Sequence, residues 1–403
     1  MKAAGSIVLR PGRERSVLNR HPWLFSGAVA KVEGKPTPGG LVAVIDAGGS
    51  RLAVGFYNPQ SDIRVRLWAF GAEAERDFED ALRERLARAI AWRAERLDAH
   101  DTDMARLVNG EGDALGGVIV DHYAGHLVVE PLAFYIERHL DVFLAALLDA
   151  ARPAFPVRSV RFRVESEAAA REGMTLADEA RAITEAAPET TPARELGLTY
   201  RVDLARGQKT GFFIDQRDNR FLVRALAKDR RVLNLFAYTG GFTLNALAGG
   251  AREVVSVDAS QPALDLLDEN AALNGFSGRG GATHADVKNF LPQAQERSER
   301  FDLVVCDPPP FARKTSHVER ASRAYKDVNR RAMSLLDDGL LLTFSCSPFI
   351  PSKLFRQIVF AAAVEAGREA AVLRELGPGL DHPVGLYHPE GAYLCGFLLR
   401  VHA

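Results

Sequence analysis

The sequence predicts an α/β protein with three domains, the last of which contains a doubly wound, mostly parallel sheet. The chain has 403 residues, more than one hydrophobic core usually serves. Its first seventy residues alternate apolar and polar side chains in short runs, whereas its second half alternates strand-like and helix-like segments. We therefore predict domains at residues 1–71, 72–190 and 191–403.

The first domain is predicted to be a small β-barrel. Residues 41–45 and 63–68 form alternating runs, and turn-forming clusters rich in proline, glycine and serine lie at 36–40 and 47–50. Alternation between turn clusters is typical of a small antiparallel barrel or sandwich.

The second domain is predicted to be a small α/β domain. Its first helix is expected from about 72 to 99, where apolar residues recur at spacings of four. Strand-like runs follow at 117–121 and 127–130, and a second helix is expected near 137–151. Nothing in this part of the sequence points to a particular chemistry.

The third domain is predicted to carry the parallel sheet. Near-continuous apolar runs are typical of strands that are buried on both faces. Such strands are expected at 232–236, 254–257, 301–305, 340–344 and 393–401.

Charge and cysteine content narrow the class of protein. The net charge is -1, but residues 1–70 hold ten Lys and Arg against four Asp and Glu, so the front of the chain is basic. Three scattered cysteines predict neither disulfides nor a metal site. No signal peptide and no membrane-spanning stretch is recognised, so we predict a cytoplasmic protein with no membrane partner.

A nucleoside site is predicted where the first strand of the parallel sheet ends. Residues 237–242 form a glycine-containing turn, and Asp258 ends the next strand, where a carboxylate can accept hydrogen bonds from both ribose hydroxyls. The turn lacks the GxGxxG of dinucleotide sites, and Asp286 follows the third strand, in place to contact an adenine. This favours S-adenosylmethionine over a dinucleotide. Helix capping is the alternative for both acids: it is less favoured for Asp258 and equally favoured for Asp286.

A reaction site is predicted at the same edge of the sheet. Asp307, Pro308, Pro309 and Phe311 directly follow a strand, where rigid prolines aim carbonyls at a planar base and the phenyl ring offers a stacking face. Cys346 follows the next strand. A thiolate that adds to C6 of a pyrimidine makes C5 nucleophilic enough to accept a methyl group.

We also predict roles for the other two cysteines and for a basic segment. Cys306 and Cys395 lie within strands and are predicted to be structural, as any free cysteine often is. Residues 313–331 hold seven Lys and Arg against two acids, which suits either a flap that contacts RNA phosphates or a solvated basic helix. The side chains expected to bind RNA here are Arg313, Lys314, Arg323, Tyr325 and Lys326.

Motifs along nearly the whole chain resemble those of the RlmI-like 23S rRNA cytosine-C5 methyltransferases. The segments GQKTGFFIDQRDNR (207–220), NLFAYTGGF (234–242), DPPPF (307–311) and SCS (345–347) resemble that family's methyltransferase motifs in order. HPWLFSG (21–27) and GFYNP (55–59) resemble its N-terminal PUA domain, an RNA-binding β-barrel.

The resemblance implies a fold, an activity and a set of site residues. It implies a PUA domain, a central α/β domain and a class I Rossmann-like methyltransferase domain, acting on 23S rRNA as a homodimer. Cys346 would be the nucleophile, and Asp307 would handle protons or bind the cytosine edge. Arg10 and Arg20 of the basic front are further expected RNA contacts. Cofactor contacts are expected at Phe213, Asp215, Gln216, Asn234, Phe236, Tyr238, Gly240, Asp258, Asp286 and Asp307.

Three alternatives stay open at this point. A base N-methyltransferase would also suit an acid-proline-proline-aromatic turn and would need no thiol. A non-catalytic RNA-binding factor in ribosome assembly would keep the fold and lose the reaction. A dinucleotide oxidoreductase is the least favoured.

Overall fold

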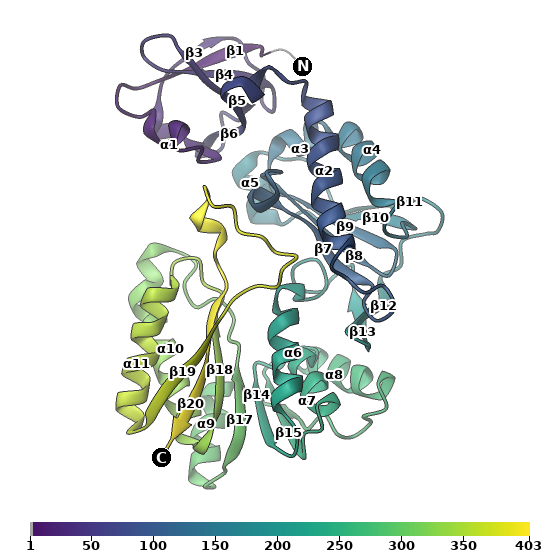
Figure 1. The fold of residues 1–403 in the computed structure, drawn as a ribbon, viewed down its shortest axis with the longest axis vertical. Helices are drawn as coiled ribbons and strands as arrows, with labels where there is room; N and C mark the ends of the chain where they lie inside the picture. Colours follow the sequence, from purple (N-terminus) through teal and green to yellow (C-terminus); the bar gives the residue numbers. More distant parts are fainter. Residues whose placement is uncertain (1–2) are drawn as a thin grey trace. The chain divides into compact units, whose positions relative to one another are not determined.

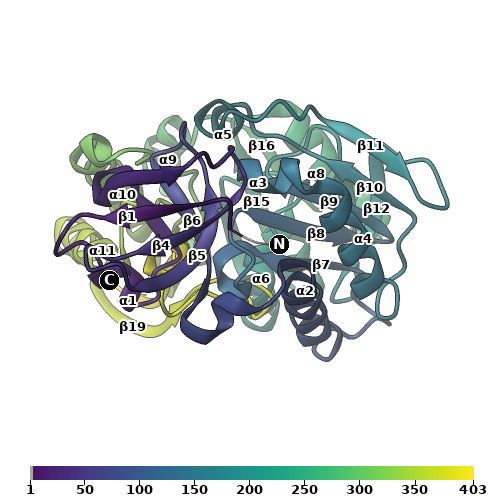
Figure 2. The same cartoon turned by 90° about the horizontal axis from the view of Figure 1, so that it is seen from above.

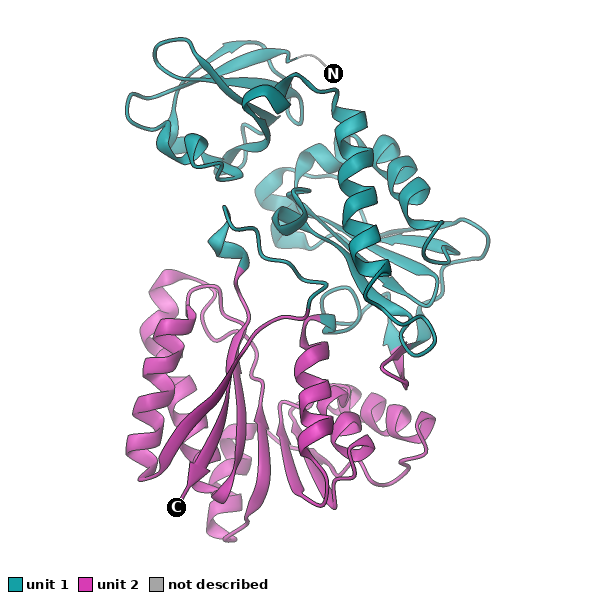
Figure 3. Cartoon of the chain, viewed as in Figure 1, with its two compact units in different colours: residues 1–193, 202–214, 380–391 teal, residues 194–201, 215–379, 392–403 magenta. Residues whose placement is uncertain are grey.

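The computed structural model describes residues 3–403, which divide into two compact units (Figure 3). Unit 1 comprises the described residues up to 193 together with 202–214 and 380–391. Unit 2 comprises 194–201, 215–379 and 392–403. The division near 193 lies close to the predicted boundary at 190. The segments 202–214 and 380–391 differ from the prediction, because both were assigned to the third domain and both belong to unit 1.

The N-terminal part of unit 1 is a six-stranded sheet in the order β2-β6-β5-β4-β1-β3 (Figure 1). Alternate side chains such as Val42 and Val44 are fully buried, so the polarity pattern of these strands reflects one core-facing side. The elements are β1 (Gly5–Leu9), α1 (Arg15–Leu18), β2 (Trp23–Phe25), β3 (Val29–Gly34), β4 (Leu41–Ile45), β5 (Arg51–Tyr57) and β6 (Ile63–Phe70).

The remainder of unit 1 is an α/β domain with a five-stranded sheet in the order β11-β10-β9-β8-β7 (Figure 2). Helix α2 (Phe78–Ala94) begins where the Asp77 carboxylate accepts a hydrogen bond from the backbone N–H of Glu79 at 2.8 Å. The other elements are β7 (Met104–Asn109), β8 (Val118–Tyr123), β9 (His126–Pro131), α3 (Phe134–Arg138), α4 (Leu140–Ala151), β10 (Ser159–Phe162), α5 (Ser166–Glu172) and β11 (Glu179–Ala182).

Buried polar contacts explain why residues 380–391 belong to unit 1. Arg93 is 1% exposed, pairs with Asp113 at 2.7 Å, and donates to the carbonyl of Asp381 at 2.8 Å. Asn109 donates to the carbonyl of Pro383 at 3.0 Å. Removing this segment would take one acceptor from the buried Arg93 guanidinium and one from the Asn109 amide, and an unsatisfied buried donor is costly.

Unit 2 is built on a seven-stranded sheet in the order β16-β15-β14-β17-β18-β20-β19 (Figure 1). Strand β20 runs opposite to the other six strands of this sheet. Val232 and Leu233 are both buried but pack in different core clusters, so β14 is covered on both faces. The strands are β14 (Arg231–Leu235), β15 (Glu253–Asp258), β16 (Ala282–His284), β17 (Phe301–Cys306), β18 (Leu336–Ser345), β19 (Glu369–Leu376) and β20 (Cys395–His402).

Two sets of helices cover the sheet of unit 2. Helices α6 (Arg217–Leu226) and α7 (Gly241–Ala248) contribute to one core cluster, and α9 (Val287–Glu296), α10 (Val318–Ser334) and α11 (Ser352–Ala366) contribute to the other. Helix α8 (Gln261–Leu273) packs beside β15 and β16. The chain enters unit 2 through the two-stranded sheet of β12 (Thr190–Glu195) and β13 (Leu198–Asp203). The predicted doubly wound α/β architecture is confirmed.

Candidate active site

The carboxyl ends of β14, β15, β17 and β18 meet at one edge of the sheet in unit 2. Leu235 pairs with Val257 on one side and with Cys306 on the other. The next residues along the three strands are Phe236, Asp258 and Asp307, so the two carboxylates flank the turn that follows β14. In doubly wound sheets this is the edge at which ligands bind.

The turn after β14 has a strained backbone. Phe236 has φ +60°, Tyr238 has φ +46° and Gly240 has φ +86°. A Cβ on Gly240 would lie 2.7 Å from Cγ of Leu267, so only glycine fits there. Residues held in this left-handed region cluster at ligand sites, because the surrounding structure must enforce them.

The Asp258 carboxylate holds this strained turn. One oxygen accepts the backbone N–H of Tyr238 at 2.8 Å and the other accepts the N–H of Ser260 at 2.8 Å. The N-cap of α8 is Ser260, so the capping alternative for Asp258 is not what the structure has. The carboxylate lies beside the turn, where it can also meet a ribose.

Asp286 is a helix cap in this structure. Its carboxylate accepts the backbone N–H of Lys288 at 2.9 Å at the start of α9. The capping alternative is therefore realised, and the expected adenine contact stays a prediction.

Asn234 belongs to a buried polar chain beneath the turn. It is 1% exposed and donates to Thr243 at 3.0 Å; the Thr243 hydroxyl lies 2.7 Å from that of Ser256, which donates to the Gly280 carbonyl at 2.7 Å. These contacts fasten α7 to the sheet. They give Asn234 a structural role, and its cofactor contact stays a prediction.

Two acids at this edge are oriented by contacts that the sequence analysis did not predict, since Gln216 was expected only as a cofactor contact and Tyr393 was not named as a site residue. Gln216 donates to the Asp307 carboxylate at 3.0 Å and accepts from Asn219 at 2.6 Å. Asp215 is 2% exposed and accepts from the hydroxyl of Tyr393 at 2.6 Å. The spacing of Gln216 and Asn219 on one helical turn was the only sequence signal for the first pair.

The Cys346 thiol lies at the same edge, just after β18. It is partly exposed and donates to the carbonyl oxygen of Pro308 at 3.5 Å. The structure thus brings the cysteine next to the proline turn. Cys306 and Cys395 have raised pKa values because they are buried, to about 11 for Cys395, and no disulfide joins any cysteines of residues 3–403.

The role expected for Tyr325 was wrong. Its side chain is 0% exposed and lies on the inner face of α10, 4.6 Å from the ring of Phe311. Its hydroxyl is 2.9 Å from that of Ser347, which also accepts the backbone N–H of Ala312 at 3.3 Å. Tyr325 therefore joins the two loops that carry Pro308 and Cys346, and it cannot contact RNA from the core.

Part of the basic segment is a solvated helix, and the expected contact of its other residues with RNA phosphates stays a prediction. Arg323 pairs with Glu319 at 2.9 Å and Lys326 pairs with Glu365, so part of α10 is a solvated helix with local ion pairs. Arg313 and Lys314 are exposed and form no ion pair with any residue of 3–403. Pro309 is also exposed, whereas Pro308 is buried.

Three predicted contacts lie in unit 1. Phe213 is half-buried, with the ammonium of Lys209 at 4.7 Å from its ring centroid. Arg10 donates to the carbonyl of Val29 at 3.0 Å, and Arg20 pairs with Glu73 at 3.2 Å. Their binding roles stay predictions.

Neither metal binding nor membrane insertion is indicated by the described part of the chain. Among residues 3–403, no group of His, Cys, Asp and Glu is arranged to hold a metal ion. No helix within the same residues has both the length and the apolar character needed to cross a membrane.

Comparisons with known proteins define the class of this protein. A family profile described as S-adenosylmethionine-dependent methyltransferase matches residues 176–374, and a PUA-like domain profile matches 7–70. A structure described as a SAM-dependent methyltransferase from Streptococcus mutans has a TM-score of 0.82 at 20% identity, covering 98% of this chain and 99% of that one. A second, described as a methyltransferase complexed with SAH, has a TM-score of 0.83 at 20% identity, covering 98% and 99%. The fold and profiles define an S-adenosylmethionine-dependent methyltransferase with a PUA-like domain.

Sequence relatives identify the family more narrowly. Ribosomal RNA large subunit methyltransferase I of Escherichia coli (strain K12) is 41% identical over 397 residues, which is 98% of this chain and 99% of that protein. The Klebsiella pneumoniae (strain 342) protein of the same name is 40% identical, covering 98% of each chain. The chain belongs to the ribosomal RNA large subunit methyltransferase I family.

Proposed function

We propose that this protein methylates C5 of a cytidine in 23S ribosomal RNA, with Cys346 as the nucleophile. The observation that carries this proposal is the partly exposed thiol within 3.5 Å of the Pro308 carbonyl. The proline turn that contains Pro308 lies at the same edge of the sheet as Asp307 and Asp258. A reactive thiol is required for methylation at C5 and is not required for methylation of a base nitrogen.

The reaction balances as addition, transfer and elimination. Once the Cys346 thiol has given its proton to a base, its sulfur would form a bond to C6, and the electron pair of the C5–C6 double bond would move to C5. S-adenosylmethionine, when bound, would supply the methyl group that C5 accepts, and the electrons of the broken S–C bond would stay on the donor sulfur. A base, for which Asp307 is the candidate, would then take the C5 proton, the C5–H electron pair would restore the double bond, and the thiolate would leave C6.

Different residues of the site would bind the methyl donor, the base and the RNA phosphates. Asp258 would accept the ribose hydroxyls of the methyl donor, beside the strained turn of Phe236, Tyr238 and Gly240. Asp307, with one oxygen already bound by Gln216 at 3.0 Å, is the candidate for taking protons or binding the cytosine edge. Phe311 would stack on the base, and Arg313 and Lys314 would meet phosphates.

The Cys346 thiol donates to the Pro308 carbonyl. Its hydrogen bond to the Pro308 carbonyl requires the S–H donor, so that contact favours the neutral thiol. Formation of the thiolate would break this hydrogen bond and free the sulfur to reach C6. The Pro308 carbonyl would then be available to an amino group of the base.

Methylation mapping tests the assignment. Nucleoside mass spectrometry of large-subunit RNA from a strain that lacks the protein should miss one 5-methylcytidine, which the intact gene restores and Cys346→Ala does not. An unchanged map would leave the substrate without support. Restoration of that 5-methylcytidine by Cys346→Ala would contradict the role of Cys346 as the nucleophile, and loss of an N-methylated nucleoside in place of 5-methylcytidine would move the assignment to nitrogen methylation.

The partners follow from the same proposal. Ribosomal RNA as substrate would place the protein in the cytoplasm, and the resemblance of its motifs implies a homodimer. Light scattering of the purified protein measures the second point directly.

A further inference from the structure

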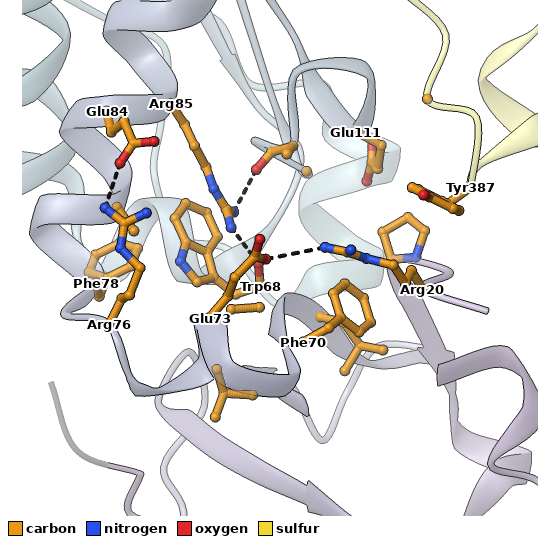
Figure 4. Close-up of a pocket in the computed structure, with 18 of the residues that line it drawn as sticks. Arg20, Trp68, Phe70, Glu73, Arg76, Phe78, Glu84, Arg85, Glu111 and Tyr387 are labelled. Carbon is orange, nitrogen blue, oxygen red and sulfur yellow. Dashed lines mark hydrogen bonds and ion pairs between the residues drawn. The ribbon is translucent and has the colours of Figure 1, made fainter. Parts of the chain in front are cut away.

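Unit 1 contains a cavity of about 350 Å³ where segments far apart in the sequence meet (Figure 4). Phe70 comes from β6 of the N-terminal sheet and Arg20 from the turn that precedes β2, Arg85 and Arg88 come from α2, and Tyr387 comes from the 380–391 segment. The volume lies at the small end of the range of ligand sites, about 300–1,000 Å³. None of these residues belongs to the active site described above.

The carboxylates that line the cavity are already engaged. Glu73 pairs with Arg20 at 3.2 Å, and Glu84 pairs with Arg76. Glu111 accepts from the indole N–H of Trp23 at 2.7 Å and from Arg66 at 3.3 Å.

Two arginines of the cavity have no carboxylate partner among residues 3–403. Arg85 donates to the carbonyls of Trp68 and Ala114, each at 2.8 Å, and burial lowers its pKa. Arg88 lies one helical turn further along α2 and is exposed. Neither forms an ion pair with any described residue, and Glu84 and Glu73 act on them without direct contact, so this wall of the cavity carries two arginines that no carboxylate binds directly. Such a wall favours an anion.

Aromatic rings stand beside these charges. The guanidinium of Arg85 lies 4.2 Å from the ring centroid of Trp68. That of Arg20 lies between Phe70 at 5.5 Å and Tyr387 at 5.6 Å. Tyr387 is 54% exposed, so much of its surface is available to a second planar group. Cations next to an accessible aromatic ring are the combination that single-stranded nucleic acids bind.

We propose that this cavity binds one unpaired nucleotide of single-stranded RNA. Arg85 and Arg88 bind its phosphate, and the ring of Tyr387 stacks on its base. A base-paired nucleotide does not fit this site, because its faces are covered by its neighbours in the helix. The inference rests on the proposed function in that RNA is the substrate, and it adds a second point of attachment away from the methylated base.

Fluorescence anisotropy with a short labelled oligocytidylate tests the proposal on the full chain, at several salt concentrations. Tyr387→Leu should weaken binding by about 5- to 150-fold, the range for loss of one stacked base. Arg88→Gln should weaken it and lower the slope of log affinity against log salt by about 0.7, the value for one single-strand phosphate. Arg83→Gln is the matched control, since Arg83 lies on the same helix, pairs with Asp149 and does not line the cavity.

The outcomes separate the cavity from the proposed function. Losses confined to the two cavity variants, with S-adenosylhomocysteine binding unchanged, support the proposal. RNA binding that neither variant alters overturns the cavity assignment and leaves the methyltransferase assignment intact. Cytidine monophosphate that binds as tightly as the oligonucleotide, with the same sensitivity to both variants, overturns it in favour of a free-nucleotide site. Absence of RNA binding by the unaltered protein contradicts both.

Discussion

Replacing Asp258 with asparagine should weaken binding of the methyl donor although the side chain keeps its shape. The two carboxylate oxygens of Asp258 accept separate backbone N–H groups, those of Tyr238 and Ser260, each at 2.8 Å. An asparagine has a single oxygen, so its amide N–H must face one of these two donors. The variant therefore keeps only one of the two hydrogen bonds that hold the strained turn.

The size of the effect follows from the strength of the missing hydrogen bond. A hydrogen bond to a charged group contributes about 1.5–3 kcal/mol, which corresponds to about a 10- to 150-fold change in affinity. We expect the Kd for S-adenosylhomocysteine to rise by that factor. The free energy of unfolding should fall by about 1–2 kcal/mol, because one backbone N–H then faces the amide N–H of the asparagine and has no acceptor.

Isothermal titration calorimetry with S-adenosylhomocysteine measures the first quantity, and urea denaturation measures the second. Asp286→Asn is the matched control for the denaturation measurement. Asparagine caps a helix as well as aspartate does, so the free energy of unfolding of this variant should not change. Unchanged affinity in Asp258→Asn would refute the role of this carboxylate.

Three further predictions concern other groups of the chain. At about pH 8, iodoacetamide should alkylate Cys346 and spare Cys306 and Cys395, whose raised pKa values keep them protonated; intact-mass analysis that finds Cys395 modified first would contradict this. Tyr325→Phe should lower the free energy of unfolding by about 1–2 kcal/mol, because it removes the hydrogen bond to Ser347 that joins the loops of Pro308 and Cys346. It should also slow methylation without changing the Kd of S-adenosylhomocysteine; an unchanged rate would contradict the positioning role. Burial lowers the pKa of His122 from 6.5 to about 4 in the folded protein. The free energy of unfolding should therefore fall by about 3 kcal/mol as the pH is lowered from 6.5 to 4, because the unfolded chain takes up a proton that the folded chain does not. His122→Gln should remove this pH dependence in urea denaturation.

The strands that position the active site were predictable because burial on both faces leaves a continuous apolar run. All five predicted strands of the third domain are present, with ends shifted by a few residues. Strand β19 was missed because seven of its eight residues are exposed at the sheet edge, so no buried run marks it. Edge strands bury too little to leave such a pattern.

Long-range pairing accounts for what the sequence did not reveal. The 380–391 segment joins unit 1 through contacts such as Arg93 with Asp381, which are 288 positions apart. Tyr393 and Asp215 are 178 positions apart and likewise share no local pattern. The burial of Tyr325 could have been predicted from local sequence, because Ala321, Val328 and Ala332 lie on the same buried face of the helix. The surrounding arginines obscured that pattern.

The central claim is that the Cys346 sulfur bonds to C6 of a cytidine during methyl transfer, and trapping that bond tests it most directly. A fluorine at C5 of the target cytidine cannot leave as a proton, so elimination stops after methyl transfer. Incubation of the protein with S-adenosylmethionine and fluorinated RNA should give a covalent protein–RNA complex by intact-mass spectrometry, and Cys346→Ala should give none. A complex that persists in Cys346→Ala, or methylation of unmodified RNA by that variant, would contradict the account.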